Sequence, residues 1–273
     1  MKRYGWLLGC CLFLSIGMLW AADEPDLRML QQKAAQSRDM EGYVGVCKYL
    51  YQTEENPELL LLYADSIHQL ATKSKKPEQL VEYYIWASEG NFIKGDFQQG
   101  YALKRKAIAL AEKAGLKFAI SQSCCDMGYY CNVDARYDSA RYYFRKGLEA
   151  GEDLSEAGEA CRTMLTNYAS SFLFEGKTDS ALVYTIRASE RSAADKDTAM
   201  LIENLNQLGT IYRRKKNLEN CIANFEQALH LCELRGNHNA VAFIYGNIAT
   251  AYCDWDRPED AISFSEKALK YAL

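Results

Sequence analysis

Histidine serves in catalysis and metal binding more often than any other side chain, and this chain has only three, His68, His230 and His238. His230 and Cys232 are close in sequence, but Gly236 lies between them and His238, so one helix face cannot carry all three ligands. No metalloprotease, serine-hydrolase, phosphate-loop or dinucleotide-binding motif occurs. The carboxylates are scattered, and no pair suited to acid–base catalysis stands out. We therefore predict no catalytic residues, no metal site, no cofactor and no enzymatic activity.

Cysteine is unusually frequent, with ten in the chain. There is no Cys-x-x-Cys pair, and no histidine follows Cys124, Cys125 and Cys131 at the spacing of a zinc site. Free cysteine behaves as a small apolar side chain, so we expect buried thiols. Disulfides are the alternative for an exported chain.

The first 22 residues have the three parts of a secretory signal peptide. Lys2 and Arg3 precede an apolar run at 6–20, and Ala21-Ala22 precedes a polar break. The run is short for a membrane span. We expect cleavage after Ala21 or Ala22, which places the chain in the periplasm or cell envelope. The alternatives are an uncleaved anchor and a lipoprotein, because residues 7–10 (Leu-Leu-Gly-Cys) resemble a lipobox.

Composition indicates a globular protein, with 49% hydrophobic and 25% charged residues and a formal net charge of −4. The densest basic run, 213–216, falls at an expected helix end, where a solvated surface is the ordinary explanation. A mildly acidic chain without a basic stripe argues against direct nucleic-acid binding.

Residues 23–76 are predicted to be helical but irregular, with helices at 25–37, 39–53 and 57–73. Asn56-Pro57 is a start signal, a capping residue followed by proline in the first turn. We interpret this segment as an N-terminal cap or a degenerate repeat.

From Pro77 onward, small residues recur at three positions in steps of 40 or 41 residues. All fifteen are Gly, Ala, Ser or Cys, as helices in close contact require. The first position is on the first helix of each pair and the other two are on the second: Ser88, Gly128, Ala169, Gly209 and Ala249; Gly100, Ala140, Ala181, Cys221 and Ala261; Ala107, Gly147, Ala188, Ala228 and Ala268.

The stretch 203–236 carries Leu208-Gly209, Tyr212, Phe225 and Ala228 at the spacing of a tetratricopeptide repeat (TPR). The chain thus resembles the TPR family over 77–273, in five units at about 77–115, 118–151, 158–193, 199–236 and 239–273. Its period of about 40 residues exceeds the usual 34. The resemblance implies an all-α, right-handed TPR superhelix behind the signal peptide, with the first helices lining a concave groove.

Polar residues beside the core positions of the first helices are the candidate groove residues. Asn167, Gln207 and Asn247 share one register, and Ser170, Thr210 and Thr250 share another, as amides and hydroxyls suited to an extended peptide backbone would. Ordinary surface polarity is the competing explanation. The full predicted set is Asp126, Tyr129, Asn167, Ser170, Asn206, Gln207, Thr210, Arg213, Asn247 and Thr250.

The resemblance implies a non-catalytic scaffold outside the cytoplasm whose partner is a protein or extended peptide. The alternative is the sensor region of a membrane signalling protein, with its span and its kinase or regulatory module beyond Leu273. Membrane contact is expected only through an uncleaved signal or such a missing part. The last helix is interpreted either as the array's own cap or as a point inside a longer chain.

Overall fold

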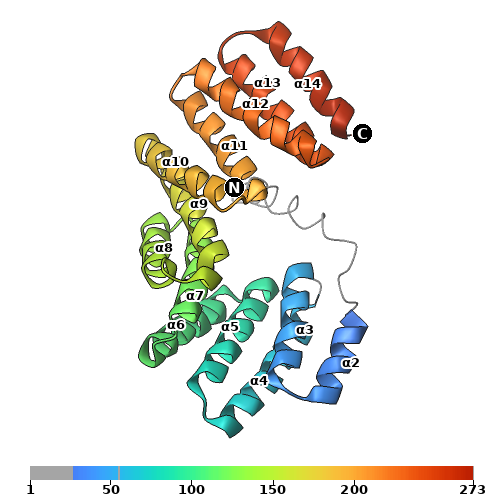
Figure 1. Ribbon diagram of the computed structural model, residues 1–273, viewed down its shortest axis with the longest axis vertical. Coiled ribbons are helices and arrows are strands. Elements are labelled where there is room, and N and C mark those ends of the chain that lie inside the picture. Colours follow the sequence, from blue (N-terminus) through green and yellow to red (C-terminus); the bar gives the residue numbers. More distant parts are fainter. Residues whose placement is uncertain (1–26, 55, 273) are drawn as a thin grey trace. The chain divides into compact units, whose positions relative to one another are not determined.

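The computed structural model describes residues 27–54 and 56–272, and every regular element in these ranges is helical (Figure 1). The all-α prediction is thereby confirmed, whereas the predicted signal peptide and its alternatives lie outside the described residues. The early helices are α2 (Leu27–Ser37), α3 (Met40–Thr53), α4 (Pro57–Ser74), α5 (Pro77–Lys94), α6 (Phe97–Ala114), α7 (Lys117–Val133) and α8 (Tyr137–Gly151). After the short 3-10 helix η2 (Ser155–Ala157) come α9 (Gly158–Phe174), α10 (Thr178–Ala194), α11 (Thr198–Arg214), α12 (Leu218–Leu234), α13 (His238–Asp254) and α14 (Pro258–Ala272).

Local chemistry explains where several of these helices begin. The Asn56 side chain accepts the backbone N–H of Leu59 at 2.9 Å, and Pro57 occupies the first turn of α4, as the sequence predicts. Asp197 and Asn237 cap α11 and α13 in the same way. The three helices expected at 25–37, 39–53 and 57–73 correspond to α2, α3 and α4 within two residues at each end.

The described residues form two compact units. The amino-terminal unit comprises residues 27–130 (except 55) and 145–161, and the carboxy-terminal unit comprises 131–144 and 162–272. Helices α7, α8 and α9 therefore contribute residues to both. The grouping of the helices into a cap and five repeats stays a prediction.

Each unit has its own apolar core. In the amino-terminal unit, α3 to α6 bury Val46, Leu60, Ile85 and Leu103 together. In the carboxy-terminal unit, α11 to α13 bury a cluster that includes Leu208, Phe225, Ile244 and Ile248. Because burial of apolar surface is the dominant favourable term in folding, these clusters fix how the paired helices pack.

The small residues of the three registers are where close packing requires them. Fourteen of the fifteen are buried, and only Ala268, on α14, is partly exposed. A Cβ at Gly209 would lie 2.5 Å from Cε1 of Phe225, so the contact between α11 and α12 depends on the absence of a side chain there. The prediction that small residues permit close helix contact is confirmed.

The glycines that follow second helices are of two kinds. Gly115 and Gly236 have φ of +68° and +65°, so they end α6 and α12 in the left-handed conformation that glycine adopts without strain. Gly151 is different, because it is the last residue of α8 and does not have a positive φ. A Cβ there would collide with the Ser121 hydroxyl, so Gly151 is required for packing rather than for a turn.

Within the described ranges, no helix combines the length and apolar character that crossing a membrane requires.

Candidate functional site

The predicted groove residues of the carboxy-terminal unit lie on α9, α11 and α13, the first helices of its pairs. We call this surface the first-helix face. It consists of Asn167, Ser170, Asn206, Gln207, Thr210, Asn247 and Thr250. Thr250 is exposed and the other six are partly buried, so their polar groups lie at the surface without being fully solvated. That a partner binds to these residues stays a prediction.

Amide side chains on this face connect one first helix to the next. The Gln207 Nε2 group on α11 donates to Ser170 Oγ on α9 at 2.6 Å. The Asn247 Nδ2 group on α13 donates to Asn206 Oδ1 on α11 at 2.7 Å. The backbone carbonyl of Asn167 accepts from Asn132 Nδ2 at 3.0 Å. The shared register of the amides therefore has a structural use, because these bonds join successive helix pairs.

The hydroxyl groups of the face are engaged within their own helices. Thr210 donates to the carbonyl of Asn206 at 3.2 Å, and Thr250 donates to the carbonyl of Gly246 at 2.8 Å. Such bonds to the preceding turn leave the hydroxyl oxygen able to accept another hydrogen.

On and beside the first-helix face, four polar groups have no hydrogen-bond partner among the described residues. They are the side-chain amide of Asn167, Nδ2 of Asn206, Oδ1 of Asn247 and the carboxyl of Glu203, one turn before Asn206. Burial, reinforced by the charge of Asp197, raises the pKa of Glu203 to about 7. Neutral donors and acceptors on the face thus lie near one carboxyl, that of Glu203, whose pKa is close to neutrality.

Arg213 lies at the end of α11 and is partly buried. Its Nε is 3.7 Å from Oδ2 of Asp254 on α13, so part of its charge is balanced within the unit. Because the pair is also close to solvent, its contribution to stability is small.

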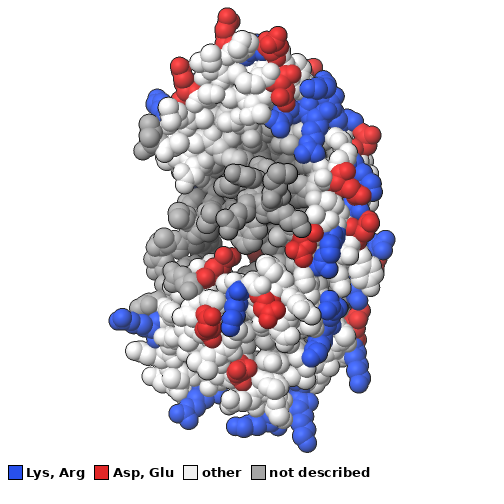
Figure 2. Space-filling view, turned by 180° about the vertical axis from the view of Figure 1, so that it is seen from behind, with Lys and Arg blue, Asp and Glu red and all other residues white. Residues whose placement is uncertain are grey.

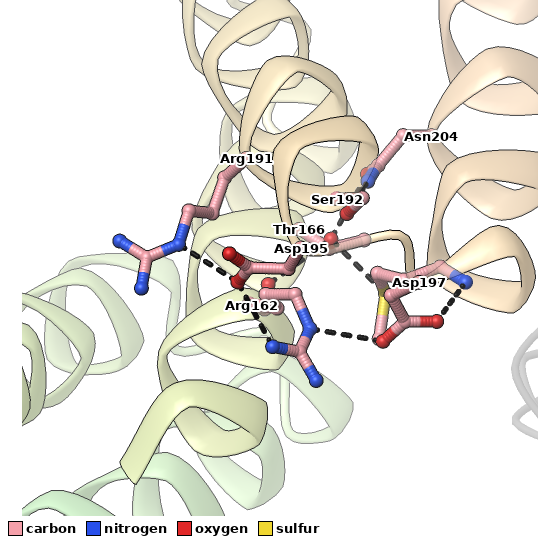
Figure 3. Close-up of polar contacts among 8 residues, drawn as sticks. Arg162, Thr166, Arg191, Ser192, Asp195, Asp197 and Asn204 are labelled. Atoms are coloured by element: carbon pink, nitrogen blue, oxygen red, sulfur yellow. Dashed lines mark hydrogen bonds and ion pairs between the residues drawn. The ribbon is translucent and has the colours of Figure 1, made fainter. Parts of the chain in front are cut away.

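A second polar network fixes the start of α11 against α9 and α10 (Figure 3). The guanidinium of Arg162 lies between two carboxylates and donates to Asp195 and Asp197, each at 2.9 Å. Deeper in the unit, Thr166 Oγ1 donates to Asn204 Oδ1 at 2.9 Å, and Asn204 Nδ2 donates to the Ser192 hydroxyl at 3.1 Å. Every buried side-chain group of Asn204 is therefore used, and the network is structural.

The amino-terminal unit contains a buried cluster of charged side chains. Lys104 on α6 is fully buried, and its ammonium contacts the carboxylates of Glu89 on α5 and Asp126 on α7, the latter at 2.9 Å. The Tyr130 hydroxyl donates to the other oxygen of Glu89 at 2.7 Å. Asp126 thus has an internal partner, while Tyr129 lies partly buried beside Tyr130, with ring centroids 5.4 Å apart.

Burial and ion pairing oppose each other in this cluster. Burial disfavours the charged form of Lys104, but Asp126 and Glu89 outweigh it and raise the pKa of the ammonium above its ordinary value. Burial also raises the pKa of Glu89, although Lys104 acts in the other direction. A lysine whose pKa is raised holds its proton, so it is poorly suited to act as a general base or nucleophile.

The position of Lys104 in its repeat is a sequence signal for this cluster, although its carboxylates do not form a pair in the sequence. Lys104 occupies the same position in its helix pair as Phe144 and Phe225 do in later helix pairs, where both are core residues. Thr185 occupies the same register, and its hydroxyl donates to Gln207 Oε1, 22 residues ahead, at 3.0 Å, just as Lys104 donates to Asp126. A polar residue at this register therefore marks an internal partner on the next first helix.

The cysteines and the possible metal ligands do not come together in a reactive site within the described ranges. Seven of the eight cysteines in the described ranges are buried and Cys253 is exposed, and none of the eight is joined to another in a disulfide bond. Over the same ranges, no group of three or more His, Cys, Asp and Glu side chains is placed to hold a metal ion. Figure 2 shows one face of the molecule, on which basic and acidic side chains lie interspersed.

These helix pairs define a helical-repeat protein. Comparison with known families shows which class of repeat it contains. Residues 198–273 match the family model described as "Tetratricopeptide repeat". That segment consists of tetratricopeptide repeats, and the chain as a whole has a TPR-type fold. No curated protein matches the chain by sequence.

Solved structures of the same fold cover most of the chain. BtubC (BKLC) from P. vanneervenii is 16% identical, with a TM-score of 0.67 over 83% of this chain and 91% of that protein. The apo form of RapI is 10% identical, with a TM-score of 0.70 over 90% and 73%. A Rap protein complexed with Competence and Sporulation Factor is 12% identical, with a TM-score of 0.57 over 90% and 70%. At these identities the likeness shows the fold alone.

Proposed function

We propose that this chain is a non-catalytic scaffold that binds an extended segment of a peptide or partner protein on the first-helix face. The observation that carries the proposal is that amides on three successive first helices keep unsatisfied groups, at Asn167, Asn206 and Asn247. Neutral amides both donate and accept, so they complement a peptide backbone without requiring a particular charge.

Two further observations support the proposal. The titratable groups of the amino-terminal cluster are paired with one another, so they offer no free acid or base for catalysis. A protein of the same fold, the Rap protein, has been solved complexed with Competence and Sporulation Factor. That complex is a property of the Rap protein, and it illustrates that the fold accommodates a bound factor.

The test is equilibrium binding of peptides selected on the wild-type chain from a phage-displayed library of random 12-residue peptides. We expect Asn167→Ala combined with Asn247→Ala to weaken binding by about tenfold, since two hydrogen-bonding groups are lost. The matched control is Asn224→Ala combined with Gln227→Ala, both on the second helix α12. Peptides that bind both double variants equally, with melting curves showing both folded, would contradict the proposal.

We also propose that the scaffold acts outside the cytoplasm, in the periplasm or cell envelope. Support comes from the signal-peptide pattern of residues 1–22. A free-standing scaffold and a sensor region of a membrane protein would use the same face, and the reading frame beyond Leu273 distinguishes them. An alkaline phosphatase fused after residue 26 should be active if export occurs, and an inactive fusion would count against it.

A further inference from the structure

Helix α14 carries an apolar face that stays exposed among the described residues. Ile262 and Leu269 are two helical turns apart, so they lie on the same side of the helix. These two residues are 59% and 60% exposed. A different side of α14, which includes the buried Ala261, packs against α13 (Figure 1). The face formed by Ile262 and Leu269 is therefore left for another contact.

The same positions are covered on the preceding second helix. One repeat earlier, they are occupied by Ile222 and Leu229 of α12. Both are partly buried and pack against the apolar cluster of α11 to α13, because α12 lies against α13 as well as α11. Helix α14 thus keeps the large apolar side chains that a neighbouring helix covers elsewhere in the unit, and burying them would be favourable.

Two exposed side chains of opposite charge border this face of α14. Glu259 lies one turn before Ile262, and Lys270 directly follows Leu269. Neither has an ionic partner among the described residues. They are about three full helical turns apart, so they border the same side of the apolar stripe. The face therefore has an unpaired negative charge near its start and an unpaired positive charge near its end.

A second α14 running in the opposite direction complements this pattern. A two-fold symmetric contact brings the same surface of both copies together, so that each residue meets its counterpart's partner. With Ile262 of one copy against Leu269 of the other, Glu259 of each copy comes close to Lys270 of the other. A parallel arrangement would instead bring like charges together. Glu266, near the middle of the face, is one turn before Lys270, whose charge offsets it.

We infer that two copies of this chain associate through antiparallel α14 helices, with Ile262 packed on Leu269 and Glu259 paired with Lys270. One helix face on each copy is smaller than a standard interface, so the dimer is reversible, with a dissociation constant of about 1–100 µM. Helix α14 contributes no residue to the first-helix face, so this inference is independent of the proposed function.

Sedimentation velocity of the full chain from about 1 to 200 µM tests the association. We expect the wild-type chain to shift from monomer to dimer as its concentration rises. Ile262→Asp places a charge in the centre of the contact, so this variant should stay monomeric throughout. The control Val183→Asp changes an apolar residue that is 64% exposed on α10, and it should dimerise like wild type. Melting curves check that both variants are folded.

Charge exchange tests the antiparallel pairing itself. Glu259→Lys and Lys270→Glu should each weaken the dimer about tenfold, because each variant creates two repulsive contacts per dimer. The variant with both changes, and an equimolar mixture of the two single variants, should recover the wild-type affinity. The control Glu219→Lys reverses an exposed charge at the same register of α12 and should have no effect.

The possible results decide the inference without reference to peptide binding. A wild-type chain that stays monomeric at the highest concentration would overturn it, and so would a dimer that Ile262→Asp leaves intact. If the double variant and the mixture stay as weak as the single variants, the antiparallel pairing is wrong. Binding of peptides to the first-helix face is measured separately, so it can stand or fail by itself.

Discussion

Lys104 shows how one side chain can replace an aromatic residue in a repeat core. It is fully buried at the register of Phe144 and Phe225, and two carboxylates balance its charge. A buried ion pair gains little over an apolar core, but removing one partner leaves an uncompensated buried charge. The cluster therefore holds α5, α6 and α7 together mainly because separating them would leave a buried charge unpaired. The net attraction between its members contributes less.

We expect Lys104→Met to lower the free energy of unfolding by about 3–5 kcal/mol, because Glu89 would be left buried without its cation. Urea unfolding followed by circular dichroism measures this loss. Adding Glu89→Gln should restore part of it, since glutamine carries no charge. The exposed Lys113→Met is the control, and an equal effect at Lys113 and Lys104 would refute the buried-charge explanation.

Glu203 makes stability depend on pH. Its folded-state pKa of about 7 is above the ordinary value of 4.5, so the folded chain holds this proton more tightly than the unfolded chain. Stability from this group is therefore present at low pH and is lost as pH rises toward 7. Glu203→Gln should be more stable than wild type by about 1–2 kcal/mol at pH 8, with little difference at pH 4.5. Urea unfolding curves that differ equally at the two pH values would contradict this assignment.

The cysteines should react according to their burial. Burial raises the pKa of Cys47 and Cys124 to about 12 and that of Cys221 and Cys232 to about 11. Since the thiolate is the nucleophile, brief treatment of the native chain with iodoacetamide should modify Cys253 and spare these four. Peptide mapping by mass spectrometry locates the label, and rapid labelling of Cys221 in the folded chain would show that its packing is wrong.

At the scale of the helix, glycine has opposite roles at two positions. A Cβ at Gly209 would lie 2.5 Å from the Phe225 ring, whereas one at Gly246 would have nothing within 4 Å. Gly209→Ala should therefore lower the free energy of unfolding by about 1–3 kcal/mol through overpacking. Gly246→Ala should raise it by about 0.5–1 kcal/mol, because alanine favours a helix. Equal shifts in the two melting temperatures would argue against the assigned contact between α11 and α12.

The helices could be predicted from the sequence because their signals are local and repeated. Small residues at three registers indicate which faces touch, and capping residues such as Asn56 mark where helices begin. The packing role of Gly151 could not be predicted from the sequence, because Ser121, which a Cβ there would meet, lies on the preceding helix α7.

The candidate site could be predicted only in part. The register of Asn167, Gln207 and Asn247 indicates a common face, but it does not say which atoms are already bonded. Those bonds join residues 35 to 41 positions apart and depend on side-chain orientation. The Lys104 cluster was missed because its members come from three helices and only the fold brings them together.

At the scale of the whole molecule, the described residues form paired helices, and their buried apolar clusters lie within one or the other compact unit. Among these residues, no group of three or more His, Cys, Asp and Glu side chains is placed to hold a metal ion. Several of the chain's polar side chains join one helix pair to the next. Amide groups on α9, α11 and α13 have no partner among the described residues, and we propose that a partner binds to this face.

Photo-crosslinking tests this central claim most directly. A peptide selected on the wild-type chain, carrying benzoylphenylalanine in place of one apolar residue, is irradiated with the full chain, and mass spectrometry locates the crosslinks. We predict crosslinks on the first helices α9, α11 and α13, and their suppression by excess unlabelled peptide. Suppressible crosslinks confined to the second helices α10, α12 and α14 would contradict the account.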